Sequence, residues 1–199
     1  MGRSEDKQED IFNAAIDEFA EKGMIATTME SIAHKANVSK RTLYKYYPCK
    51  EDLLTTAVDK LLQRIEQLHF VDFDPQKELI EQLRNLGTNA LQLTNDDDYL
   101  KLSKIVIIES MRSKKAAEYL DRKFRQCESG IHHWFQQASD AGMLGKMDAR
   151  VAGEIFYGAI RKFTYWDQAI RWKEKLSDEE ADQLIEDICQ FFVKGCSQK

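Results

Sequence analysis

Helix-breaking residues are scarce in this chain. Its 199 residues include two prolines, Pro48 and Pro75, and nine glycines. Because proline and glycine are the residues that most disfavour the interior of a helix, their scarcity permits long uninterrupted helices. No stretch of useful length alternates apolar with polar residues, which is the pattern of a half-buried strand. The sequence therefore predicts an all-α fold.

Apolar residues recur at three- and four-residue spacing in nine segments, and each segment predicts one amphipathic helix. The predicted helices cover, in chain order, residues 7–22, 28–35, 39–46, 50–68, 74–93, 98–112, 114–141, 148–172 and 177–194. We place a boundary between the fourth and fifth helices. We therefore expect an N-terminal three-helix domain of residues 1–50, a connecting helix over 51–68, and a larger helical domain of residues 69–199.

Several predicted helix starts carry recognisable capping signals, including Ser39 as the N-cap of the third helix and a capping box of Ser177 with Glu180 at the ninth. Thr27 and Glu30 have the spacing of a capping box at the start of the second helix, with Thr28 as the alternative cap. At the fifth helix, Asp74 followed by Pro75 is typical of an N-cap residue and a first-turn proline.

The charge of the chain is unevenly distributed. The net charge is −5, which by itself argues against nucleic-acid binding. The window from His34 to Lys50 nevertheless contains five lysine or arginine residues and no acidic residue, so it carries +5 and leaves −10 on the rest of the chain. A concentrated basic segment on an acidic protein is typical of a local nucleic-acid contact.

Within this basic window, two short predicted helices are joined by a tight turn. Asn37 occupies the turn, and asparagine tolerates the left-handed backbone conformation. In the helix after the turn, Leu43 and Tyr47 can pack inward. Its polar surface offers donors suited to base edges and phosphates in a major groove: Ser39, Lys40, Arg41, Thr42, Tyr44, Lys45 and Tyr46.

Residues 8–55 resemble the signature of the TetR/AcrR family in both order and spacing. The resemblance is carried by Gly23, by Thr27-Thr28-x-x-x-Ile32-Ala33, by Val38-Ser39-Lys40-x-Thr42-Leu43-Tyr44-x-Tyr46-Tyr47 and by Lys50-Glu51-Asp52-Leu53. It implies an N-terminal helix-turn-helix domain and a C-terminal helical domain for ligand binding and dimerisation. Two positions depart from the usual pattern: the turn glycine is Asn37, and Cys49 replaces a small polar cap before Lys50.

The same resemblance implies roles for the DNA-contacting residues. Base edges or adjacent phosphates would be contacted by Ser39, Lys40, Arg41 and Thr42. Phosphates would be held by Tyr44, Tyr46 and Lys50, and Lys45 would reach a phosphate or the edge of the groove. Thr27 or Thr28 would present the N-terminus of the second helix to the DNA backbone.

For the C-terminal domain, the resemblance implies a pocket enclosed by the fifth to seventh helices, with an apolar or aromatic small molecule as the effector. Candidates for the pocket, of which only a part would contact ligand, are Tyr99, Ile108, Met111, Phe124, Trp134, Tyr157, Tyr165 and Trp166. The last two helices would pair with those of a second subunit in a homodimer. The candidates for that interface are Ile155, Phe156, Ala159, Phe163, Leu184, Ile188, Phe191 and Phe192.

These features predict a ligand-responsive regulator that represses transcription from a palindromic operator of double-stranded DNA. Activation of transcription, or a helical protein-interaction module without DNA binding, are the alternatives. The common phosphate-loop, dinucleotide, serine-hydrolase and zinc-protease motifs are absent from the sequence, so we expect no enzymatic activity and no cofactor.

Cysteine spacing and terminal composition exclude two further classes. The nearest approach to a metal set is Cys127 with His132 and His133, but adjacent residues on a helix point in different directions, so we expect no metal site. The N-terminal residues lack the apolar core of a signal peptide, and the longest apolar run, Ile105–Ile108, is too short to span a membrane. We therefore expect a soluble, cytoplasmic protein.

Overall fold

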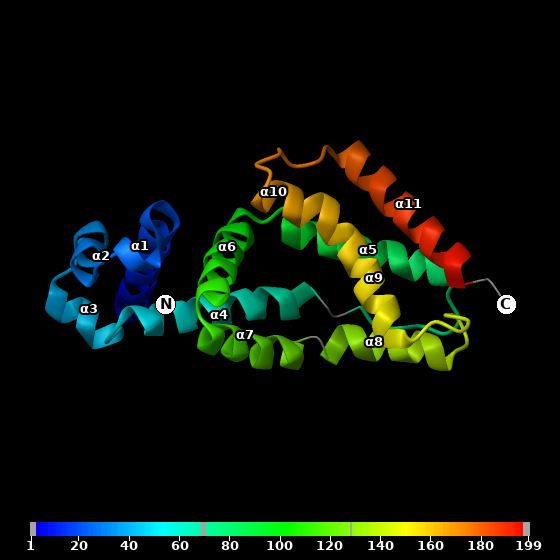
Figure 1. The fold of residues 1–199 in the computed structure, drawn as a ribbon, viewed down its shortest axis with the longest axis horizontal. Helices are drawn as coiled ribbons and strands as arrows, with labels where there is room; N and C mark the ends of the chain where they lie inside the picture. The colour runs from blue at the N-terminus through cyan, green and yellow to red at the C-terminus, as the bar shows by residue number, and fades with distance from the viewer. Residues whose placement is uncertain (1–2, 69–70, 128, 197–199) are drawn as a thin grey trace. The chain divides into compact units, whose positions relative to one another are not determined.

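The computed structural model describes the backbone of residues 3–68, 71–127 and 129–196 and the side chains of residues 5–66, 71–125 and 130–196. Every regular element in these ranges is helical, which confirms the all-α prediction. The elements in chain order (Figure 1) are α1 (Arg3–Ala26), α2 (Met29–Lys35), α3 (Lys40–Tyr46), α4 (Lys50–Leu68), α5 (Leu79–Thr94), α6 (Asp97–Arg112), α7 (Lys114–Cys127), α8 (Ser129–Asp140), α9 (Ala149–Arg161), the π-helix η1 (Lys162–Trp166), α10 (Asp167–Ala169) and α11 (Asp178–Cys196).

The chain divides into two compact units. The first combines the residues up to Leu62 with Lys101–Arg122, and the second combines Gln63–Leu100 with the residues from Lys123 onward. Helices α4, α6 and α7 therefore each contribute residues to both units. In the first unit α1 packs on α2 and α2 packs on α3, and in the second α5 packs against α9 and α11 (Figure 1).

The start of α2 differs in one detail from the expected capping box. Thr28 is the N-cap, and its hydroxyl accepts a hydrogen bond from the backbone N–H of Ser31 at 3.0 Å. The Ser31 hydroxyl in turn accepts from the backbone N–H of Thr28 at 3.3 Å. The predicted box between Thr27 and Glu30 is thus wrong, and the alternative cap is confirmed. The reason is that Thr27 is buried and its hydroxyl donates instead to the backbone oxygens of α1.

The predicted start of the fifth helix at Asp74 is also wrong. Asp74 accepts hydrogen bonds from the backbone N–H groups of Gln76 and Lys77, which close a turn rather than a helix. The side chain of Gln82 binds both backbone polar groups of Asp74 at 2.9 Å. Because the Gln82 side chain bonds to the backbone N–H and carbonyl of Asp74 in this turn, α5 begins only at Leu79.

The two longest predicted helices, 114–141 and 148–172, each correspond to more than one element. The first corresponds to α7 and α8, which lie on either side of residue 128, and that residue lies outside the described residues. The second corresponds to α9, η1 and α10, which follow one another without a gap, so the helix continues through a π-helical segment and ends at Ala169.

A cluster of opposite charges accounts for the early end of α10. The carboxylate of Asp167, almost buried, lies 2.7 Å from the ammonium of Lys173 and 2.9 Å from that of Lys162. Hydrogen bonds from these two lysines hold the pKa of Asp167 at about 2. The backbone N–H of Lys173 also donates to the carbonyl of Asp167, and Trp172 between them takes a left-handed φ of 55°. This turn, which includes Trp172, ends the helix before the predicted residue 172.

Aromatic side chains form the centre of the second unit. The rings of Phe135, Phe156 and Phe192 lie 5.6 to 6.1 Å from one another. All three side chains are buried within a single copy of the chain. Phe156 and Phe192 therefore belong to the core, because burial against their own unit leaves no surface for a second subunit.

The turn between α2 and α3 offers a direct test of the local fold. Asn37 has a φ of 52°, as the sequence predicted. Replacing Asn37 with alanine should lower the free energy of unfolding by about 1 kcal/mol, because the left-handed conformation disfavours a residue with a Cβ and no side-chain amide. Asn37→Gly is the control and should be at least as stable as the parent chain, since glycine adopts this φ without steric cost. Urea unfolding followed by circular dichroism measures both; equal midpoints for the two variants would contradict the prediction.

Candidate nucleic-acid interface and ligand pocket

Helix α3 is fixed at both ends and along one face. At its start, the Ser39 hydroxyl accepts a hydrogen bond from the backbone N–H of Thr42 at 3.1 Å. Leu43 is fully buried and Tyr47, just after the helix, is nearly so. The Gln8 amide of α1 donates to the Tyr47 hydroxyl at 3.5 Å. These contacts orient α3, so its remaining side chains face away from the unit.

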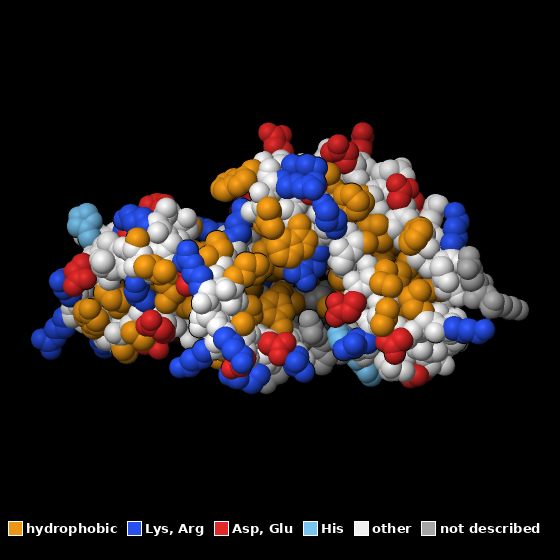
Figure 2. Space-filling model, in the orientation of Figure 1, with side chains coloured by type: hydrophobic (Ala, Val, Ile, Leu, Met, Phe, Trp, Pro, Cys, Tyr) orange, Lys and Arg blue, Asp and Glu red, His pale blue; other side chains and the backbone are white. Residues whose placement is uncertain are grey.

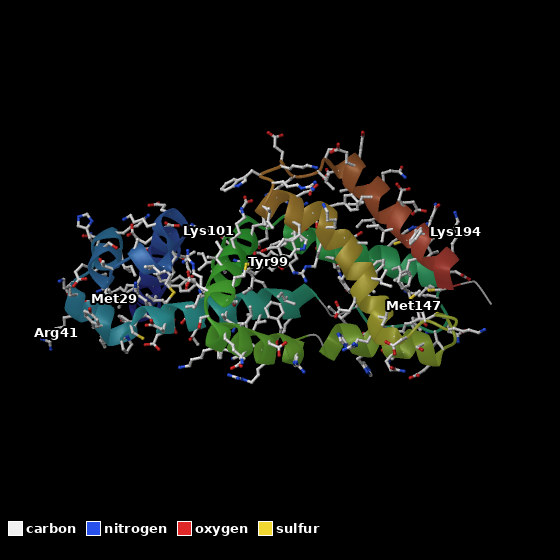
Figure 3. The ribbon with its side chains drawn as sticks, in the orientation of Figure 1. Met29, Arg41, Tyr99, Lys101, Met147 and Lys194 are labelled. Atoms are coloured by element: carbon white, nitrogen blue, oxygen red, sulfur yellow. The ribbon has the colours of Figure 1, made fainter. Side chains whose placement is uncertain are left out.

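The outward face of α3 has the composition expected of a DNA-contacting surface. Ser39, Lys40, Arg41, Tyr44 and Lys45 are exposed, and Thr42 and Tyr46 are partly exposed. The Arg41 side chain points away from α3 into solvent (Figure 3). The Ser39 and Thr42 hydroxyls lie 2.8 Å apart, and the Lys45 ammonium lies 5.6 Å from the centre of the Tyr46 ring. The structure thus brings seven predicted DNA-contacting residues onto or beside one short helix.

Three of the five basic residues in the window bind groups of the protein itself. The Lys35 ammonium lies 2.7 Å from the carboxylate of Glu21. The Lys40 ammonium lies 2.8 Å from that of Glu30 on α2, and this hydrogen bond raises the pKa of Lys40 and lowers that of Glu30. Among the described residues, Arg41 and Lys45 have no carboxylate within ion-pair distance. These two cations are therefore available to a phosphate without first breaking an ion pair.

Lys50 is directed into its own unit. Its ammonium donates to the backbone oxygens of Met24 at 2.6 Å and of Thr27 at 2.7 Å. These carbonyls lie after Gly23, whose φ of 76° interrupts α1, in the short last segment of the helix and just beyond it, where terminal carbonyls lack partners within the helix. Lys50 thus caps α1. Because its ammonium is used in this way, the structure argues against Lys50 as one of the phosphate contacts expected from the sequence.

Thr27 and Thr28 differ sharply in accessibility. Thr27 is 1% exposed, and its hydroxyl donates to the carbonyls of Glu18 and Gly23. Thr28 is exposed and caps α2. Of this pair, Thr28 alone can present the start of α2 to a DNA backbone, because Thr27 is enclosed by its own unit.

The second unit contains a pocket of about 110 Å³ between helices. Its apolar wall is formed by residues of α4 to α9: Ile65, Leu86, Ala90, Leu93, Tyr99, Phe124, Ile131, Gly153 and Tyr157. Its polar lining consists of Asn89, Thr94, His132, Glu154 and Arg161. Burial raises the pKa of the hydroxyl groups of Tyr99 and Tyr157, so both are neutral donors at neutral pH.

Three of the eight aromatic or apolar pocket candidates line this pocket, namely Tyr99, Phe124 and Tyr157. The others have different places. Tyr165 is buried behind Tyr99, with the two rings 6.1 Å apart, and Trp166 packs on Tyr165. The remaining three are Trp134, which is buried in the aromatic core, and Ile108 and Met111, which are exposed.

The polar lining was not predicted, because only apolar and aromatic residues were taken from the sequence as candidates for the pocket wall. Glu154, Tyr157 and Arg161 are spaced three and four residues apart, which places them on one face of α9. That periodicity could have drawn attention to Glu154 and Arg161. In the sequence, His132 was weighed only as part of a metal set with Cys127, whose side chain lies outside the described residues, and that set was rejected. In the part of the chain that is described, no three potential ligands gather in a metal-binding cluster.

A stripe of exposed apolar side chains follows α9 and η1 at four-residue spacing. Val151, Ile155 and Phe163 are each between 44% and 49% exposed, and Ala159 lies between them. On α11, Phe191 is 78% exposed, with Leu184 and Ile188 partly exposed. Figure 2 shows hydrophobic surface over α9 and α11. Six of the eight candidates for the subunit interface thus remain on the surface of one chain.

A helix fixed by buried residues after a tight turn, with cations and hydroxyls on its free face, defines a helix-turn-helix DNA-binding protein. Comparison with known proteins supports this class. Residues 11–57 match the N-terminal domain of the bacterial regulatory proteins of the tetR family, and residues 81–195 match the C-terminal domain of AefR-like transcriptional repressors. The chain belongs to the TetR family of transcriptional regulators, which confirms the resemblance found in the sequence.

Individual relatives span nearly the whole chain. The HTH-type transcriptional regulator YdeS of Bacillus subtilis (strain 168) is 25% identical over 199 residues, covering 97% of this chain and 91% of YdeS. A TetR family transcriptional regulator from Pseudomonas syringae pv. tomato str. DC3000 superimposes with a TM-score of 0.79 at 28% identity, covering 94% of each chain. The flavonoid-responsive regulator FrrA superimposes with a TM-score of 0.68 at 27% identity, covering 96% of each chain.

The two lysines near α3 should respond differently to removal of their charge. Lys50→Met should lower the free energy of unfolding by about 1–2 kcal/mol, because it leaves the carbonyls at the end of α1 without a charged donor. Lys45→Met is the matched control and should change stability by less than about 0.5 kcal/mol, since Lys45 is exposed. Thermal unfolding measures both, and equal losses of stability would show that Lys50 does not act as a cap.

The ion pair between Glu30 and Lys40 should weaken DNA binding. Glu30→Gln removes a negative charge beside α3 and releases the Lys40 ammonium, so affinity for DNA should rise about threefold at low salt. Glu21→Gln is the control: it removes the same charge, but from the partner of Lys35, which lies outside α3. Fluorescence anisotropy with a labelled duplex measures both variants. An equal gain in the two would attribute the effect to net charge and not to Lys40.

Proposed function

We propose that this protein is a ligand-responsive repressor that binds a palindromic operator as a homodimer and is released by a small molecule. The observation that carries the DNA-binding part of the proposal is the exposed pair Arg41 and Lys45, for which the described residues supply no carboxylate within ion-pair distance, on a helix held from behind by Leu43 and Tyr47. Such a helix can enter a major groove without rearrangement of its own unit.

Each exposed residue of α3 has a role in this proposal. Ser39, Arg41 and Thr42 lie in or beside the first turn of the helix, the part that meets base edges in helix-turn-helix proteins. Arg41 can donate two hydrogen bonds to a guanine. Lys40 also contacts base edges once its ammonium leaves the carboxylate of Glu30 and binds the DNA. The phosphate contacts are assigned to the residues nearer the end of the helix and to the α2 cap, namely Tyr44, Lys45, Tyr46 and Thr28.

The exposed apolar stripe supports a homodimer. Ile155, Ala159 and Phe163 recur every four residues, so they form one face that water would solvate poorly. Leu184, Ile188 and Phe191 provide a second such face on α11. A two-fold axis would bring two copies of this surface together, and the same symmetry suits the two half-sites of a palindrome.

Helix α6 gives a physical route for the response to ligand. It carries Tyr99, which lines the pocket, and two residues later Lys101, whose ammonium forms an ion pair with Asp17 of α1. The N-terminal end of α6 is tied to α4 by the ion pairs of Arg64 with Asp96 and Asp98. A ligand that prefers a shifted α6 would bias these contacts toward a state with lower affinity for DNA.

Two comparisons support this choice of function. FrrA, which has the same fold, is described as responsive to flavonoids, consistent with an aromatic effector. The family of C-terminal domains that matches residues 81–195 is described as repressors, which favours repression over activation. A helical interaction module that has lost DNA binding is disfavoured, because α3 retains exposed cations.

The proposal predicts how DNA affinity depends on salt. The three cations of α3, Lys40, Arg41 and Lys45, displace condensed counterions from the duplex whether they bind bases or phosphates. A dimer brings about six of them to the DNA, so the logarithm of the association constant should fall with a slope of about −5 against the logarithm of salt concentration. Fluorescence anisotropy with the DNA upstream of the gene measures this slope.

Arg41→Gln and Arg150→Gln are a matched pair for that measurement. Arg41→Gln should weaken binding to the operator more than to random DNA, because its contacts are assigned to base edges. Arg150 is exposed on α9, and its replacement should leave both affinities unchanged. A salt slope near zero, or equal losses for operator and random DNA in Arg41→Gln, would contradict the proposed recognition.

A further inference from the structure

The pocket of the second unit contains a cation for which the described residues provide no carboxylate partner. Arg161, the last residue of α9, lines the pocket, and its guanidinium carbon lies 5.8 Å from the centre of the Tyr165 ring. Among the described residues, none supplies a carboxylate within ion-pair distance of Arg161. A guanidinium over an aromatic face keeps the edge with its N–H groups free, and that edge fits a carboxylate.

The neighbourhood of Arg161 is aromatic. Tyr99 lies close enough for the positive charge of Arg161 to act on its hydroxyl, although burial dominates and raises the pKa of Tyr99. The Tyr99 and Tyr165 rings meet edge to face, so Arg161 faces a wall of rings. Tyr157 lies one helical turn before Arg161 on the same face of α9. An anion held by Arg161 would therefore lie next to neutral hydroxyl donors and aromatic carbon.

Glu154 also lines the pocket, but it lies seven residues before Arg161. That separation is about 10 Å along the helix axis. No ion pair between the two is found in the described part of the chain. The imidazole of His132 is part of the same lining as Glu154 and can serve it as a hydrogen-bond donor. Within the lining, the carboxylate thus has a possible protein donor, whereas the guanidinium of Arg161, an exposed residue, has no carboxylate acceptor among the described residues.

The volume of the pocket limits the size of the molecule that can carry a carboxylate to Arg161. Its volume of about 110 Å³ is comparable with that of an engineered cavity of about 150 Å³ that binds benzene. Three aromatic side chains, Tyr99, Phe124 and Tyr157, stand in its wall. Aromatic walls favour a flat ring through offset or edge-to-face contacts. One six-membered ring with a small charged group fits these limits.

We propose that the pocket binds a monocyclic carboxylic acid in its ionised form, with the carboxylate against Arg161 and the ring among Tyr99, Phe124 and Tyr157. This inference rests on the proposed function only in taking the pocket as the effector site. It narrows the apolar or aromatic effector expected from the sequence to an anionic one.

Three nearly isosteric probes test this chemistry on the full chain. Benzoate, benzamide and benzamidine share a ring and differ in charge. Isothermal titration should show benzoate binding about tenfold more tightly than benzamide, because only benzoate forms a charge-assisted pair with Arg161, and benzamidine should bind more weakly than either. Equal affinities for benzoate and benzamide, tighter binding of benzamidine, or no binding of any probe would overturn the proposal.

Two variants test whether Arg161 causes the preference for benzoate. Arg161→Gln should abolish the preference for benzoate while changing benzamide affinity by less than about twofold, which also shows that the pocket is intact. Arg150→Gln removes the same charge from a residue of α9 that does not line the pocket and should keep the preference. A preference for benzoate that survives Arg161→Gln would overturn the assignment.

DNA binding separates this inference from the proposed function. Each probe is added to the complex of the protein with its operator. If benzoate binds with the stated preference but leaves DNA affinity unchanged, the ligand chemistry is supported and the ligand response is contradicted. If the protein binds operator DNA but none of the three probes, the assignment of a carboxylate ligand is overturned and DNA recognition stands.

Discussion

Burial of Leu43 and Tyr47 is the constraint on which the function of this protein depends. These two side chains hold α3 against its unit, and in doing so they decide which side of a seven-residue helix faces outward. A helix this short has little stability of its own in water, so it exists because its apolar face is packed. The backbone that carries the cations and hydroxyls of the other face is consequently fixed before DNA binding, so only their side chains have to be ordered at that moment.

Electrostatics then separates cations that stabilise the unit from cations that can meet DNA. Lys50 caps α1 and Lys35 pairs with Glu21, so both belong to the folded unit itself. In the proposed complex Arg41 and Lys45 are the cations that meet DNA, and Lys40 could serve either purpose because its pair with Glu30 is exposed. The same separation holds in the second unit, where lysines enclose Asp167 while Arg161 faces the pocket.

Much of this arrangement could be predicted from the sequence, and the failures have physical causes. Periodicity identified the helices around α3 and the left-handed turn at Asn37, because both are local. Sequence could not tell Thr27 from Thr28, since the difference is that one of them is buried against α1. Nor could it tell Phe156 from Ile155: both are apolar and adjacent, and only tertiary packing decides which one faces the core. Asp74 failed as a helix cap because the side chain of Gln82, eight residues later, closes a turn there.

The central claim is that α3 of each protomer is the element that reads DNA. A structure of the full chain bound to its operator tests it most directly. The account predicts one copy of α3 in each of two successive major grooves, about 34–36 Å apart, with Arg41 at a base edge and Lys50 still bound to the end of α1. A complex in which α3 faces solvent, while another surface of the protein contacts the duplex, would contradict it.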